Sequence, residues 1–363
     1  MTELERSRGI INETDKEMAK LFLKRMEAVK SVAEYKRLHG MQVLDPQREA
    51  EVIARNSQLV ENEEIKSYYV SFLKGNMEIS KNYQHRLLEG MHVAFSGVEG
   101  AFAEVAAKKV FPDSVAVPFG DFKSAYNSVV DGVTDCVILP IENSFNGDVG
   151  QVMDLAFFGP LYINGVYDIG VVQNLIANDG ADINDIKEVI SHPQALGQCA
   201  EFIKENNLST IEAVNTAVAA KQVAESGRTD IAAIGSEEAA LKYGLKIIKS
   251  HINASNSNTT RFAVFSRTLK QPTNEDNHFI MLFTVNNEAG ALGKAISIIG
   301  DNGFNLKALK SRPTKELIWN YYFYVEGEGN INSEKGNKML SELSEKCSEL
   351  KVIASFEKEI TLK

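Results

Sequence analysis

A run of amide, hydroxyl, cationic and aromatic residues at 256–262, NSNTTRF, stands at the head of a stretch with strand propensity. Threonine is common in strands, so Thr259 and Thr260 have an ordinary structural interpretation. Arg261, flanked by hydroxyl and apolar residues, is also well suited to bind a carboxylate through paired hydrogen bonds. The run therefore predicts either a plain strand or a site for a small organic acid.

Five further groups of polar residues stand where a short apolar run ends. They are the glycine loop 96–102, Glu142-Asn143-Ser144, His192 within 191–194, Asn215-Thr216, and Ser236-Glu237. Each group has a structural explanation, because Asn, Ser and Thr often cap helices and a lone histidine is more often structural. However, α/β sheets bind ligands beyond the carboxyl ends of their strands, and a glycine loop exposes N–H groups to an anion. Five such groups at strand ends favour a binding cleft.

A second set of candidates consists of cations in the amino-terminal region. Residues 3–38 contain no proline, and their apolar residues recur at steps of seven, which predicts a long helix that pairs with a second copy. Arg8, Arg25 and Lys36 occupy seam positions where leucine is usual. Because a buried cation is costly unless it is paired, these residues are either exposed register devices or ligands of an anion.

Two nearby groups extend this cationic lining. The expected N-cap at residue 45 and ordinary helical spacing place each group on one face of a second and a third helix. The groups are Asp45, Arg48 and Glu49, and Ser80 with Gln84. Such a lining can hold a small dianion and donate hydrogen bonds to an ether-like oxygen.

Charge divides the chain into three regions that position these groups. Residues 1–89 contain 15 basic and 15 acidic residues, residues 277–363 contain 11 of each, and the region between them contains 13 basic and 23 acidic residues. The net charge of −10 argues against nucleic-acid binding. An anion in the middle region must therefore rely on a few placed cations and on backbone donors.

Length and composition limit the remaining classes. A chain of 363 residues with 44% hydrophobic residues is long enough for two or three domains. No apolar run is as long as a membrane span, and the amino end has no signal-peptide core, so no membrane partner is expected. Cys136, Cys199 and Cys347 are widely spaced and odd in number, which fits a reduced cytoplasm. The six histidines form no i,i+4 pair, so no metal site is expected.

The middle region, 91–270, alternates apolar runs with helix-like stretches, which predicts a mostly parallel α/β fold in two lobes with a cleft. Strands are expected at 91–95, 114–119, 136–141, 170–176, 188–193, 210–214, 230–236 and 260–266. Helices are expected at 103–110, 121–130, 195–206 and 216–226.

After a polar linker at 270–277, the region 277–363 shows a β-α-β-β-α-β order that is typical of a ferredoxin-like module. Its expected strands are 278–285, 305–313, 318–329 and 351–360, and its helices are 290–303 and 333–348. The module contains no nucleophile–base pair, so its simplest role is dimerisation.

The amino-terminal region resembles the all-helical chorismate mutases. The family's active-site pattern matches Arg8, Arg25, Lys36, Asp45, Arg48, Glu49, Ser80 and Gln84. The resemblance implies that Arg25 and Arg48 hold the carboxylates of chorismate, that Lys36 and Gln84 face its ether oxygen, and that a partner chain supplies Arg8. The rearrangement to prephenate needs no nucleophile, only clamped carboxylates and stabilised charge.

The middle region resembles the prephenate dehydratases. The matching motifs are the glycine loop, PIENS at 140–144, SHPQ at 191–194, a helix start at Thr216, GSE at 235–237, and Thr260-Arg261-Phe262. The resemblance implies that Thr260 donates to the departing hydroxyl, that Arg261 binds a carboxylate, that Phe262 packs on the ring, and that Glu142 supplies a proton. Glu142, Asn143, Ser144 and Thr216 would bind the substrate. The chain departs from the family pattern at Val98, Ala101, Ala103, Val166 and Gln173.

The carboxyl-terminal module resembles the ACT domains that bind amino acids in dehydratases of the aromatic pathway. The family's GAL motif matches Gly290, Ala291 and Leu292, and its ESRP loop matches Ser311, Arg312 and Pro313, with Lys310 in place of the glutamate. The resemblance implies that phenylalanine binds at these positions between paired modules.

Together the resemblances imply a bifunctional, cofactor-free enzyme of phenylalanine biosynthesis, with a mutase region at 1–89, a dehydratase region at 91–270 and an ACT region at 277–363. Chorismate and prephenate are its expected substrates, phenylalanine its effector, and a cytoplasmic homodimer or higher homo-oligomer its expected state. Two alternatives are an arogenate dehydratase, since the plant enzymes have a similar GVEGAF loop (97–102), and a non-catalytic two-lobed binding protein. The intact Thr260 and Arg261 argue against the latter.

Overall fold

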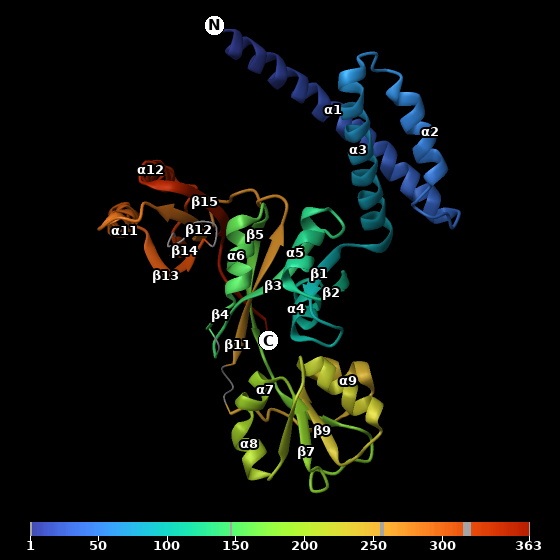
Figure 1. Cartoon of the computed structure of the whole chain (residues 1–363), viewed down its shortest axis with the longest axis vertical. Helices are drawn as coiled ribbons and strands as arrows, with labels where there is room; N and C mark the ends of the chain where they lie inside the picture. Colours follow the sequence, from blue (N-terminus) through green and yellow to red (C-terminus); the bar gives the residue numbers. More distant parts are fainter. Residues whose placement is uncertain (1, 146, 255–257, 315–320, 363) are drawn as a thin grey trace. The chain divides into compact units, whose positions relative to one another are not determined.

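The computed structural model describes residues 2–145, 147–254, 258–314 and 321–362, and the chain divides into two compact units, Met1–His92 and Val93–Lys363 (Figure 1).

The first unit is all-helical. It consists of α1 (Glu3–Leu38), α2 (Pro46–Ser57) and α3 (Glu63–Glu89). Local sequence fixes each start: Thr2 and Glu5 form a capping box, the Asp45 side chain accepts from the backbone N–H of Arg48, and Asn62 caps α3. The predicted helix at 3–38 is therefore present with the expected bounds.

Helix α1 leaves most of its apolar residues exposed within one chain. Ala33 is its buried residue, whereas Ile11, Met18 and Phe22 are exposed. At about 1.5 Å per residue the helix is roughly 54 Å long, which is longer than either α2 or α3.

The second unit is built on a sheet with the central order β13-β14-β12-β15-β5-β11-β3-β1-β2. Its first lobe contains β1 (His92–Ser96), β2 (Val115–Phe119), β3 (Cys136–Asn143), β4 (Gly147–Asp148), β5 (Tyr162–Gly170) and β11 (Thr259–Ser266), with α4 (Phe102–Val110), α5 (Phe122–Val130) and α6 (Gly150–Phe158). Strand β1 is parallel to β3, but β11 is antiparallel to both β3 and β5. The expectation of a mostly parallel sheet was wrong here, because the chain reaches β11 only after crossing the second lobe and returning.

The second lobe has a five-stranded sheet of order β10-β6-β9-β7-β8. Its strands are β6 (Asn174–Ala177), β7 (Glu188–Ser191), β8 (Ser209–Glu212), β9 (Ile231–Gly235) and β10 (Lys246–Lys249), and its helices are α7 (Pro193–Gln198), α8 (Ala200–Glu205), α9 (Thr216–Ser226) and α10 (Glu237–Tyr243). The strand expected at 170–176 is two strands, since residues 171–173 pass from one lobe to the other. The helix expected at 195–206 is likewise interrupted at Cys199.

The carboxyl-terminal module has the predicted β-α-β-β-α-β order. It consists of β12 (His278–Val285), α11 (Ala291–Asp301), β13 (Asn305–Pro313), β14 (Tyr321–Glu328), α12 (Glu334–Ser344) and β15 (Cys347–Phe356), followed by β16 (Ile360–Leu362). Residues 318–320 of the strand expected at 318–329 lie outside the described residues. Strands β15 and β16 pair with β5, and Ile280, Leu282 and Ile353 share a core with the first lobe. The module therefore continues the sheet of the first lobe rather than standing apart from it.

Candidate functional sites

The helical unit encloses a cavity of about 280 Å³ that brings together seven of the eight residues predicted for it. Helix α1 contributes Arg25 and Lys36, α2 and its cap contribute Asp45, Arg48 and Glu49, and α3 contributes Ser80 and Gln84. Arg8 is exposed and lies 17 residues before Arg25 on the same straight helix, roughly 25 Å away. The eighth residue therefore does not line this cavity within one chain.

Hydrogen bonds hold the lining residues in place. Arg25 donates to the hydroxyl of Ser80, and Lys36 donates to the carbonyl of Val43 at 2.6 Å. Gln84 is buried, its Nε2 donates to the carbonyl of Ser80 at 3.3 Å, and its Oε1 has no protein partner. An amide held in this way remains available to a ligand in the cavity.

Lys81 is a lining residue that the sequence analysis missed. Its ammonium lies 3.2 Å from Glu49, and hydrogen bonds from its ammonium to Glu78 and then Glu49 raise the pKa of Lys81 above its ordinary value. Its position three residues before Gln84 on α3 was the available signal. With Lys81, the described lining carries four cations and two carboxylates, a balance that suits a dianion.

A second cavity, of about 380 Å³, lies between the two lobes of the second unit. Its walls include Asn143, Thr216, Thr260 and Phe262 among the predicted residues, and the glycine loop contributes Gly97 and Ala101. The second lobe adds several polar groups. His192 and Asn215 belong to the groups at strand ends that the sequence marks as candidates, and Gln173, Gln194 and Gln198 are additional.

Thr260 is oriented by Asn143. The Nδ2 of Asn143 lies 2.9 Å from the Oγ1 of Thr260 and donates to it. The backbone N–H of Phe145 donates to Asn143 Oδ1 at 3.0 Å, which fixes the orientation of the amide. The Thr260 hydroxyl therefore receives one hydrogen bond, and its own proton is free for a ligand. Phe262, two residues further on, faces the same cavity because strand residues alternate between faces.

Arg261 and Glu142, which the sequence predicts as substrate contacts, are not among the described lining residues of this cavity. Alternation along β11 and β3 directs both side chains to the opposite face of the sheet, where Arg261 Nη1 lies 2.9 Å from Glu142. Ser144 also has a structural position, since its hydroxyl accepts from the backbone N–H of Thr259 at 3.0 Å. The carboxylate partners of Arg261 belong to the protein.

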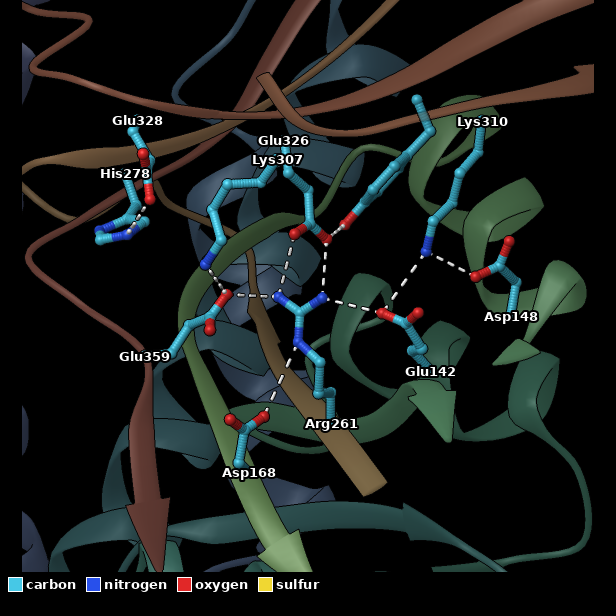
Figure 2. Close-up of polar contacts among 11 residues, drawn as sticks. Glu142, Asp148, Asp168, Arg261, His278, Lys307, Lys310, Glu326, Glu328 and Glu359 are labelled. Carbon is cyan, nitrogen blue, oxygen red and sulfur yellow. Dashed lines mark hydrogen bonds and ion pairs between the residues drawn. The ribbon is translucent and has the colours of Figure 1, made fainter. Parts of the chain in front are cut away.

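The face occupied by Arg261 is strongly charged, and Figure 2 shows its arrangement. Attraction to several carboxylates, Glu326 foremost, outweighs the effect of burial and raises the pKa of Arg261. Burial would raise the pKa of Glu142, but the hydrogen bond from Arg261 and the charge of Lys310 outweigh it and hold the pKa low. For Asp168, burial and the charge of Glu359 dominate, so its pKa is raised.

Backbone donors are the principal anion ligands available in the two-lobed cavity. No lysine or arginine occurs among its described lining residues. The first turn of α4 lines the cavity, and its N-cap, Ala101, makes no side-chain capping bond. Thr216 opens α9 at the same cavity. Helix N-termini carry free N–H groups and partial positive charge, so they can hold carboxylates.

The residues predicted for the effector lie at one end of the module's sheet. Gly290 starts α11 with φ +81°, and register links Thr284 of β12 through Tyr322 to Arg312 of β13. Arg312 forms a two-point ion pair with Asp154 of α6, at 2.8 and 3.1 Å. Lys310 lies 2.5 Å from Asp148. Both side chains thus form ion pairs with the first lobe.

Within the part of the chain that the structure describes, no helix is both long and apolar enough to cross a bilayer, and no acidic, histidine or cysteine side chains group as metal ligands do.

These features define a chain with two separate small-molecule sites, one in a helical unit and one between the lobes of an α/β unit that carries a small α/β module. Comparison with protein families agrees with this division. The model of chorismate mutase type II matches residues 7–85, and that of prephenate dehydratase matches residues 93–270. The chain belongs to the family of bifunctional chorismate mutase/prephenate dehydratases, and it is both an isomerase and a carbon–oxygen lyase.

Individual relatives cover from about three quarters to nearly all of the chain. The bifunctional chorismate mutase/prephenate dehydratase of Aquifex aeolicus is 30% identical over 99% of both chains. The arogenate dehydratase/prephenate dehydratase 2 of Arabidopsis thaliana is 34% identical over 75% of this chain and 74% of its own length. The crystal structure of prephenate dehydratase from Arthrobacter aurescens, in complex with L-Phe, is 25% identical, with a TM-score of 0.68 over 74% of this chain and 90% of that chain.

Proposed function

We propose that the helical cavity converts chorismate to prephenate and that the two-lobed cavity converts prephenate to phenylpyruvate. The observation that supports this assignment of one reaction to each cavity is the difference between the residues that line the two cavities. One carries four cations and two carboxylates, and the other presents a hydroxyl and helix N-termini.

In the helical cavity, Arg25 and Arg48 hold the two carboxylates of chorismate, while Lys36 and Gln84 face the ether oxygen. Charge develops on that oxygen as its bond to carbon breaks, and donors that are already in place stabilise it. Asp45 and Glu49 orient the cations and the substrate hydroxyl. Arg8 reaches a cavity only from a second chain, which also covers the exposed apolar face of α1, so we propose a homodimer or higher homo-oligomer.

In the two-lobed cavity, Thr260 donates a hydrogen bond to the ring hydroxyl, which leaves with the electron pair of its bond to the ring and takes up a proton from solvent water. The carboxylate departs as carbon dioxide, and the electron pair of its bond enters the ring, which becomes aromatic. Because Glu142 lies on the other face, His192 takes its place as a hydrogen-bond donor to the departing hydroxyl: its Nδ1 accepts from the Gln194 N–H at 3.2 Å, so the N–H available to a ligand is on Nε2. The N-termini of α4 and α9 hold the substrate carboxylates, and Phe262 packs on the ring.

We propose prephenate rather than arogenate as the preferred substrate because the mutase in the same chain produces prephenate. The decisive assay supplies the full chain with chorismate and follows prephenate and phenylpyruvate by absorbance and chromatography. Formation of both products is the expected result. A preference for arogenate over prephenate at equal concentrations would favour the alternative.

We further propose that phenylalanine is a feedback inhibitor that binds the carboxyl-terminal module near Gly290–Leu292 and Ser311–Pro313. The complex of the Arthrobacter aurescens dehydratase with L-Phe supports this ligand. A cytoplasmic location also belongs to the proposal, and the free state of Cys136, Cys199 and Cys347 is compatible with it.

A further inference from the structure

The guanidinium of Arg261 joins carboxylates from both halves of the second unit (Figure 2). In the dehydratase lobe, Nη1 lies 2.9 Å from Glu142, and Nε lies 3.7 Å from Asp168. In the carboxyl-terminal module, Nη2 lies 3.0 Å from Glu326 and 2.6 Å from Glu359. Arg261 therefore connects β11, the strand that carries Thr260, to the carboxyl-terminal module through ion pairs.

Glu326 is the most buried of these carboxylates. Its side chain is 6% exposed, it accepts from Arg261 Nη1 at 3.3 Å and Nη2 at 3.0 Å, and it also accepts from the Tyr324 hydroxyl at 2.7 Å. Two-point pairing between a guanidinium and a carboxylate fixes direction as well as distance. A buried pair of this kind restricts the position of Arg261 more firmly than an exposed one would.

Strand register connects this pair to the active-site cavity. Thr260 is paired with Asn143, and the next pair along the same two strands is Arg261 with Glu142. One pair faces the cavity and the other faces the module, so two adjacent backbone positions on each strand serve opposite faces. A displacement of Arg261 therefore changes the position of the Thr260 hydroxyl and of the amide that holds it.

We propose that Glu326 of the carboxyl-terminal module is a positioning residue for the dehydratase reaction. It acts through Arg261, whose backbone is continuous with that of Thr260, and it makes the geometry of the leaving-group donor depend on the docking of β14. The proposal rests on the assignment of Thr260 as that donor, which the Thr260→Ala variant described below tests separately.

The experiment compares Glu326→Gln with Glu328→Gln in the full chain. Glu328 is two residues further along β14, and its carboxylate contacts His278 and Asn305 rather than Arg261. We expect Glu326→Gln to lower kcat on prephenate about tenfold with KM changed less than twofold, because a misplaced donor affects the transition state more than binding. Glu328→Gln should retain the original kcat.

A double-variant cycle separates positioning from general damage to the fold. If Glu326 acts through Arg261, Glu326→Gln adds nothing to the loss already caused by Arg261→Gln. Independent, multiplying losses would overturn the proposal, as would an unchanged kcat for Glu326→Gln or an equal loss for Glu328→Gln. A cooperative calorimetric unfolding transition of the second unit in each variant serves as the control for folded protein.

Glu359→Gln provides a second route if Glu326→Gln fails to fold. Glu359 contacts Arg261 at 2.6 Å and Lys307 at 3.2 Å but is more exposed, at 22%. A smaller fall in kcat, again absent in the Arg261→Gln background, is the expected result. A raised KM for prephenate with kcat unchanged would contradict the positioning role.

Discussion

The Thr260 hydroxyl is the group whose chemistry depends most on a single neighbour. Asn143 donates to its oxygen, so the threonine proton is not directed at the amide and can be donated to a ligand in the cavity. A threonine hydroxyl is too weak an acid to lose its proton freely, so it acts by hydrogen bonding as the substrate hydroxyl departs.

We expect Thr260→Ala to lower kcat on prephenate by about 10² or more with a modest change in KM, since the lost hydrogen bond strengthens mainly in the transition state. Thr259→Ala is the matched control, because its side chain points to the other face and does not line the cavity. The measurement is the steady-state rate of each variant on prephenate. Equal rates for Thr260→Ala and Thr259→Ala would remove Thr260 from the mechanism.

In the helical unit we expect Arg25→Ala and Lys36→Ala each to lower chorismate turnover by about 10² or more. Lys24→Ala, an exposed cation beside Arg25 that does not line the cavity, should leave turnover nearly unchanged. All three should retain prephenate turnover, because the dehydratase cavity belongs to the other unit. Normal chorismate turnover in either cavity variant would show that these cations are structural.

The residue types at the sites were predictable, but the face on which each lies was only partly so. Thr260, Phe262 and Asn143 line the cavity as predicted. Arg261 and Glu142 could not join them, because adjacent strand residues face opposite sides and a motif read as one block ignores that alternation. The glutamines of the second lobe were missed because nothing in the local sequence shows that β11 returns beside them.

At the scale of elements, β3, β5 and β11 hold a group of charges whose acids outnumber their cations. The folded chain binds the Asp168 proton more tightly than the unfolded chain does, because the pKa of Asp168 is raised on folding. Ionised Asp168 therefore lowers the free energy of unfolding at neutral pH, and this loss disappears as pH falls through the raised pKa. Ionised Glu142 instead raises the free energy of unfolding at neutral pH, because its pKa is lowered on folding. This gain is lost as pH falls through the lowered pKa.

We therefore expect Asp168→Asn to raise the Tm of the second unit at pH 7, with the difference shrinking as pH falls toward 4. Glu142→Gln should lower the Tm at pH 7, with its difference shrinking below about pH 4.5, where Glu142 of the unfolded chain takes up its proton, and vanishing only below the lowered pKa of the native carboxyl. Calorimetry of the full-length variants over this pH range measures both. A destabilising Asp168→Asn would mean that its attraction to Arg261 outweighs the repulsion.

Element prediction was most successful where local caps determine the boundaries. Helices α1, α2 and α9 begin at the predicted residues, with side-chain caps at Thr2, Asp45 and Asn215. The break at Cys199 follows Gly197, a poor helix former in the last turn of α7. The division of 170–176 between β5 and β6 has a tertiary cause, because the chain crosses between lobes there.

At the scale of the whole molecule, the module and the first lobe share one sheet and one core, so a ligand of the module can act on the dehydratase without a separate relay domain. Inhibition requires that phenylalanine bind more favourably, by a few kcal/mol, to an inactive arrangement of the module and the first lobe than to the active one.

We expect phenylalanine to inhibit prephenate turnover and Gly290→Ala to weaken that inhibition at least tenfold, with catalysis retained. Gly290 has φ +81°, which a side chain rarely adopts, so the substitution shifts the backbone at the start of α11. Gly293→Ala makes the same chemical change in open space without positive φ. Phenylalanine titrations of the three proteins are the measurement, and a flat response of the original chain up to millimolar levels would limit the module to assembly.

The contrast between the two linings also means that ionic strength acts unequally on the two reactions. Full charges on partly exposed side chains attract a dianion over distances that salt screens, since the Debye length is about 8 Å at 0.15 M. Backbone N–H groups act only at contact, where screening is weak. Raising salt should therefore increase the KM for chorismate more steeply than the KM for prephenate, so that in a concentrated electrolyte the first step, and not the second, comes to limit the flux through the chain.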